Sequence, residues 1–161
     1  MSIQAAIADA VVVDLNAHTP RPPTTPPTPP PSPVFSQAFT AARIWRPVFD
    51  REKLATLHVT VVPRGLVDAM VSRSQNQRDA RIDVAVQHGP DPLDAAAIDG
   101  LVDLAEELAD FLQRHRPSTY TGAICTDVAL AAGSEQGFIL EHMDQYRLFT
   151  SVLSCNFRLI G

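Results

Sequence analysis

Apolar side chains recur at helical spacing over the first 16 residues of the chain. Ser2 can cap this helix, which is expected to end near Asn16. Its apolar stripe consists of Ile3, Ile7, Val11 and Leu15, widened by Ala6 and Ala10. A helix of about 15 residues is marginal alone in water, so we expect its apolar face to pack on the body of the protein or on a neighbouring subunit.

A second helical pattern begins after the loop at residues 88–94, where Asp91 or Asp94 is the expected cap. Basic residues at 114–116 suit the negative C-terminal end of this helix, and Pro117 stops it. The apolar stripe contains Ile98, Leu101, Val102, Ala105, Leu108, Ala109 and Leu112. This pattern predicts an amphipathic helix that covers one face of a sheet.

Alternating apolar and polar positions predict strands between the two helices. Residues 37–49, including Ile44 and Trp45, are expected to form the first strand, broken near Pro47, and a turn with one helical coil follows at 50–55. The second strand begins at Leu57 and is expected to stop at the turn signal Pro63-Arg64-Gly65.

A long extended stretch is expected after that turn signal, over residues 66–88. Toward the C-terminal end of this stretch, apolar and polar residues alternate as expected for a half-buried strand. Ser72 to Asp79, by contrast, holds no apolar residue and is expected to project beyond the core. Two further strands are expected at 123–130 and at about 146–160, joined by a loop through residues 133–137.

The final strand has two unlike faces. One face carries the apolar side chains Phe149, Leu153, Cys155, Phe157 and Leu159. The opposite face carries the polar side chains Thr150, Ser154, Asn156 and Arg158. This second face is too polar for burial in the same core, so we expect it to lie outside.

The elements follow the order α-β-β-β-α-β-β, which predicts an α+β fold with an antiparallel or mixed sheet packed against two helices. Between the N-terminal helix (1–19) and the body (34–161), nine of the fourteen prolines lie within residues 20–33. Proline has no backbone donor, so this run is expected to be a polyproline II spacer roughly 40 Å long. The helix is expected to form one domain with the body. Whether it packs on its own subunit or on a neighbour stays open.

Charge and cysteine content narrow the class of protein. The net charge is −5, and the basic residues are twelve arginines and one lysine, so nucleic-acid binding is not expected. Cys125 and Cys155 are too few for a disulfide scaffold, and the N-terminus lacks a signal-peptide pattern, so we expect a chain that is cytosolic when made. No apolar run approaches the roughly 18 to 20 residues that cross a bilayer, and no membrane partner is expected.

Two sets of side chains could in principle hold a metal ion. Four carboxylates share one face of the second helix: Asp99, Asp103, Glu106 and Asp110. We interpret this acidic stripe as a solvated helix face, with a divalent-cation site as the alternative. Cys125, His142 and Cys155 form the other set. A fourth ligand is missing, so two buried thiols are the preferred interpretation, and no metal or cofactor is expected.

The sequence offers little support for catalysis. Asp79, Arg81 and Asp83 line one side of a predicted strand, with Arg73 and Arg78 nearby, and could be read as a catalytic acid and an anion clamp. We interpret them instead as a polar strand face that forms ion pairs within the subunit or across an interface. No Gly-x-Ser-x-Gly elbow, His-Glu-x-x-His motif or glycine-rich phosphate loop occurs, so an enzyme is not expected.

The proline run also contains several Pro-x-x-Pro registers next to Arg21, which is the ligand pattern for aromatic-lined grooves. A semi-rigid spacer needs only the prolines, and we prefer that interpretation. A cytosolic adaptor that presents this run to a partner is kept as an alternative function.

Three segments of the body carry a family resemblance: Leu57-His-Val-Thr-Val-Val-Pro-Arg-Gly65, the run from Ser72 to Gln87, and Phe149-Thr-Ser-Val-Leu-Ser-Cys-Asn-Phe-Arg158. Together they resemble the small tail proteins of tailed bacteriophages and prophages, most closely the tail terminator, or tail-to-head joining, family. The resemblance covers most of residues 37–160 and the opening helix. The proline run departs from the family pattern, in which a shorter link joins the helix to the first strand.

The resemblance implies a structural α+β subunit that forms a ring, expected to be a hexamer, at the end of the tail tube. Its location would be the virion, after assembly in the host cytoplasm. Its partners would be further copies of itself, the tail tube protein and the head connector or neck protein, while the genome passes through without sequence-specific binding. A head-completion or other neck component is the alternative within the phage particle.

Ring closure requires a heterologous interface repeated around an axis. We expect much of it to come from two polar strand surfaces, formed by Arg73, Gln75, Gln77, Arg78, Arg81, Asp83, Thr150, Ser154, Asn156 and Arg158. A further hypothesis places the acidic stripe on the channel, where its charge would repel DNA.

Overall fold

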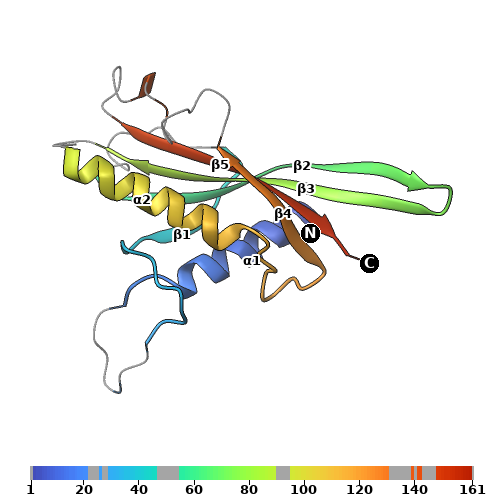
Figure 1. Cartoon of the computed structure of the whole chain (residues 1–161), viewed down its shortest axis with the longest axis horizontal. Helices are drawn as coiled ribbons and strands as arrows, with labels where there is room; N and C mark the ends of the chain where they lie inside the picture. Colours follow the sequence, from blue (N-terminus) through green and yellow to red (C-terminus); the bar gives the residue numbers. More distant parts are fainter. Residues whose placement is uncertain are drawn as a thin grey trace.

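A computed structural model of the chain describes residues 2–21, 26, 29–46, 55–89, 95–130, 139, 141–142 and 148–160. Along the chain these form α1 (Ile3–Ala17), β1 (Thr40–Arg43), β2 (His58–Ser72), β3 (Gln75–His88), α2 (Ala95–Leu112), β4 (Ala123–Leu130) and β5 (Phe149–Leu159). Both helices lie on the same side of the sheet (Figure 1). The predicted α+β class and the predicted order of elements are confirmed.

The five strands lie in the order β1-β2-β3-β5-β4. β1 is parallel to β2, and every other neighbouring pair is antiparallel, so the sheet is mixed. The register places Val61 opposite Val84 and Val84 opposite Leu153. Because side chains alternate between the two faces of a strand, these apolar positions form the face that the helices cover.

α1 packs on the sheet of its own subunit, which answers the question that the sequence left open. The Ser2 side chain caps the helix by accepting a hydrogen bond from Ala5 N at 3.3 Å. Ile7, Val11 and Leu15 are fully buried in the same core as the strands and α2. This burial stabilises a helix that would be marginal alone.

The two ends of the proline run meet. Phe35 N donates to His18 O at 3.1 Å, and His18 Nδ1 lies 2.7 Å from Pro33 O. The chain before and after the run therefore lies together, so the run does not hold the helix apart from the body. Much of the run lies outside the described residues, and its polyproline II conformation stays a prediction.

α2 carries the predicted apolar stripe and also buries Leu104. The prediction that Pro117 stops the helix is wrong, because the helix already ends at Leu112 and residues 114–116 lie beyond its last turn. Arg114 has a φ of 60°, and this left-handed conformation turns the chain out of the helix before Pro117 is reached. The predicted caps Asp91 and Asp94 lie outside the described residues.

The predicted stop at Pro63-Arg64-Gly65 is wrong, because β2 continues through it with a register shift between Pro63 and Gly65. Val61 O accepts a hydrogen bond from Ile44 N on the β1 side. The backbone nitrogen of Pro63, two residues after Val61, faces the same side of β2 but lies beyond the end of β1. No neighbouring strand needs a hydrogen bond there, so the missing N–H of proline costs nothing. The predicted single stretch 66–88 is instead the end of one strand, a turn at Arg73 and Ser74, and a second strand.

The outer strands match the predictions to different degrees. β4 has the predicted bounds, whereas β1 covers only four residues of the predicted stretch 37–49. β5 begins at Phe149, and its apolar face enters the core as predicted. The predicted coil at 50–55 and the loop through 133–137 fall largely or wholly outside the described residues.

Candidate assembly surface

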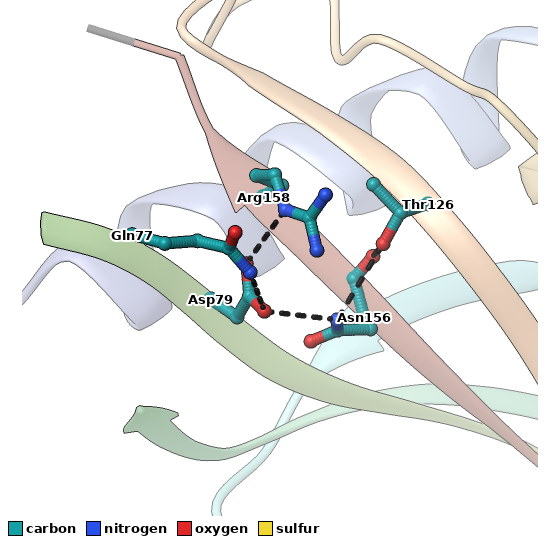
Figure 2. Close-up of polar contacts among 5 residues, drawn as sticks. All are labelled: Gln77, Asp79, Thr126, Asn156 and Arg158. Carbon is teal, nitrogen blue, oxygen red and sulfur yellow. Dashed lines mark hydrogen bonds and ion pairs between the residues drawn. The ribbon is translucent and has the colours of Figure 1, made fainter. Parts of the chain in front are cut away.

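The face of the sheet opposite the helices carries a network of polar side chains centred on Asp79 (Figure 2). Gln77 Nε2 donates to Asp79 Oδ2 at 3.0 Å, and Asn156 Nδ2 donates to the same oxygen at 3.3 Å. Arg158 Nε lies 3.3 Å from Asp79 Oδ1. Asn156 also donates to Thr126 Oγ1 at 3.4 Å, which extends the network onto β4.

A second cluster, centred on Asp83, lies four residues farther along β3. Arg64 Nε donates to Asp83 Oδ2 at 2.7 Å, and Ser154 Oγ donates to Asp83 Oδ1 at 3.1 Å. The polar strand face therefore forms ion pairs within the subunit. We call this surface the open face and define it by Asp79, Arg81, Asp83, Asp127, Ser154, Asn156 and Arg158.

Burial raises the pKa of Asp79, but hydrogen bonds from Gln77, Arg158 and Asn156 outweigh it and hold the pKa below its ordinary value. A depressed carboxyl pKa stabilises the fold at pH values above the unfolded pKa, and this contribution disappears as the pH falls through the folded pKa. We expect Asp79→Asn to lower the free energy of unfolding at about pH 7 and to cost less at about pH 3. Urea titrations of both proteins at the two pH values measure this difference. An equal cost at both would contradict the assigned role of the carboxylate.

Arg81 lies between the two clusters on β3, and its side chain forms no ion pair or hydrogen bond in the part of the chain that the structure describes. A hollow of about 490 Å³ opens beside it. Its lining includes Arg64, Arg81, Asp79, Asp83, Asp127 and Ala129. Within the described residues, the Asp127 carboxylate also has no partner. The open face thus leaves one guanidinium group and one carboxylate available to another molecule.

The hairpin of β2 and β3 projects well beyond the helices (Figure 1). We call its outer part, residues 66–78, the arm. Arg78 Nε lies 2.7 Å from Asp68 Oδ1 and joins its two strands. Large apolar side chains are nevertheless exposed along β2, with Met70 at 79% and Val71 at 62% of full exposure, and Leu66 and Val67 at about 40%. The sequence predicted the projection of the polar half but missed this apolar half.

Thr150 is a correction to the predicted interface. Thr150 is only 2% exposed, although the sequence analysis expected it on a polar strand surface of the interface. Its Oγ1 lies 3.0 Å from His142 Nδ1, and its carbonyl accepts a hydrogen bond from Ile139 N at 2.8 Å. Ile139 and His142 thus cover Thr150, which therefore cannot form an exposed interface contact.

The other predicted interface residues fall into two groups. Arg73 lies at the hairpin turn, Gln75 begins β3, and Gln77 and Arg78 lie on the arm. Arg81, Asp83, Ser154, Asn156 and Arg158 lie on the open face. The structure therefore places these residues on two adjoining surfaces of the same sheet.

The four carboxylates of the acidic stripe are all exposed on α2. Glu107, which is not part of the stripe, instead accepts a hydrogen bond from Ser36 N at 2.9 Å. This agrees with a solvated helix face, and the position of the stripe relative to a channel stays a prediction.

Cys125 and Cys155 are buried free thiols on neighbouring strands. Their mutual hydrogen bond lowers the pKa of Cys125 and raises that of Cys155. His142 bonds Thr150 on the opposite face of the sheet, so the structure does not bring the three predicted zinc ligands together. Among the described residues, no group of three or more His, Cys, Asp or Glu side chains is placed to hold a metal ion.

A buried carboxylate that the sequence analysis missed ties α1 to the segment before β4. Asp14 is 6% exposed, and His115 Nε2 lies 2.7 Å from its Oδ2. Ser118 donates to it twice, through its backbone N at 3.0 Å and through its hydroxyl. Because the hydroxyl bonds the aspartate and not the histidine, this is not the geometry of a hydrolase triad. The available signal was an aspartate three residues after Val11, on the apolar stripe.

Comparison with known proteins finds no family model that matches the chain and no curated protein that matches it. Neither helix that the structure describes is long and apolar enough to cross a membrane.

Proposed function

We propose that this chain is a structural subunit of a bacteriophage tail, a tail terminator that forms a ring at the end of the tail tube and joins it to the head connector. The proposal rests on the resemblance of the three body segments to that family. It needs no catalytic step. The ring is expected to be a hexamer, and the acidic stripe is expected to face the channel through which the genome passes.

The observation that carries the proposal is the arm. A two-stranded hairpin is marginal by itself in water, and a monomer gains nothing by exposing large apolar side chains along one. A subunit that associates with copies of itself can bury them. The arm and the open face are different surfaces of one chain, as a heterologous ring contact requires.

Electron microscopy of particles assembled without this chain tests the proposal. Tails longer than those of the wild type are expected, because nothing then stops growth of the tube. Filled heads without attached tails, together with tails of normal length, would instead assign the chain to the neck. Particles of normal appearance would contradict both assignments.

A further inference from the structure

We infer that the arm of one copy adds a strand to the free edge of β4 in the next copy. This inference rests on the proposed function and names the two surfaces that meet in the ring.

Within the residues that the structure describes, the arm has unpaired backbone along both sides. β1 pairs with β2 only as far as Val61, and β5 pairs with β3 only from Asp79 onward. Between these limits the two strands of the arm pair only with each other among the described segments. Exposed strand edges of this kind present N–H and C=O groups that another strand can satisfy.

The outer edge of β4 is suited to accept the arm as an added strand. Among the strands of the described residues, β4 is the outermost and lies next to β5 alone. Cys125 N already donates to His115 O at 2.8 Å, but beyond it, among the described residues, no further segment bonds the outer edge through the backbone. Ala129 and Leu130 are exposed at this end, with Leu130 at 46%. They supply apolar surface against which the arm's side chains can pack.

The charges of the two surfaces are complementary. Arg73 lies at the tip of the arm, and Asp127 lies on β4 at the hollow of the open face. Within the described part of the chain, neither side chain has an ion pair or hydrogen bond. Opposite charges on approaching surfaces speed association and fix its register.

A second copy is the occupant because the arm cannot reach its own β4. β3 and β5 lie between β2 and β4 in the sheet, and the arm extends away from β4 (Figure 1). Each copy therefore offers one arm and one receiving edge. A contact between unlike surfaces repeats from copy to copy and closes into a ring when the rotation permits.

The test measures the mass of the purified full-length chain against concentration by light scattering. Arg73→Glu and Asp127→Arg are each expected to weaken self-association about tenfold, and the double variant is expected to regain most of the loss. Met70→Asp should weaken association similarly, because its side chain is 79% exposed in the monomer. Arg116→Glu, at an exposed arginine after α2, is the control and should have no effect.

The outcomes separate the inference from the proposed function. If none of the three single variants changes the oligomer, the proposed contact between the arm and β4 is wrong, but the proposed ring is not contradicted. Weakened single variants without recovery in the double variant would also overturn the pairing of Arg73 with Asp127. If the wild-type chain is monomeric at every concentration, the contact does not form between purified subunits and the inference is wrong. The imaging of tail length then tests the proposed function separately. Circular dichroism confirms that each variant is folded.

Discussion

Replacing Asp14 with alanine is expected to lower the free energy of unfolding by about 3 kcal/mol. The carboxylate is buried and accepts hydrogen bonds from His115 and from both the backbone and the hydroxyl of Ser118. Its removal leaves these donors in a partly buried site without their acceptor, which costs more than the loss of an exposed bond. Because the contact joins α1 to the segment before β4, the free energy needed to detach α1 from the body should also fall. Urea unfolding followed by circular dichroism measures the change.

Asp9→Ala is the matched control for this prediction, since it removes a carboxylate from the same helix. Asp9 is paired with Arg43 at 2.5 Å, but its side chain is 41% exposed. Such a pair contributes less than about 1 kcal/mol. Asp14→Asn keeps one acceptor oxygen and should fall between the two. Equal losses for Asp9→Ala and Asp14→Ala would contradict the special role assigned to the buried site.

The elements that could be predicted from the sequence are those specified by local pattern. The apolar stripes of α1 and α2 recur with helical spacing, and β4 lies between clear breaks, so each element was identified, although α2 ends earlier than predicted. Pro63 misled the prediction because a proline ends a strand only where its missing N–H is needed. That need depends on whether a neighbouring strand reaches the same position, which is a property of the sheet as a whole.

The candidate surface could be predicted in part for the same reason. Strand alternation identified most of the open face correctly. The burial of Thr150 depends on His142 and Ile139, which reach it through the tertiary fold. The apolar half of the arm resembles an ordinary core strand in the sequence. Only the absence of a covering helix in the described structure reveals that Met70 and Val71 are exposed.

Arg81→Glu is expected to prevent ring formation while changing the stability of the monomer by about 1 kcal/mol or less. The side chain is exposed, and no ion pair or hydrogen bond within the described residues is lost when it changes. On the open face it lies between Asp79 and Asp83, whose charges are already paired with Arg158 and Arg64. A glutamate would place an unpaired negative charge there, and a partner surface that fits the guanidinium group would then be repelled. Light scattering and negative-stain microscopy of the purified chain measure ring formation.

Arg81 is a sharper target than its neighbour Arg78, which lies 2.7 Å from Asp68 and holds the two strands of the arm together. Replacing Arg78 would therefore alter the arm itself, whereas replacing Arg81 changes only the charge of the open face. Arg116→Glu introduces the same charge change at an exposed position after α2 and should leave assembly intact. If Arg81→Glu still forms rings at the wild-type concentration, the open face is not buried in the subunit contact. Loss of rings in Arg81→Glu with normal thermal unfolding, and their retention in Arg116→Glu, would place the open face inside the interface.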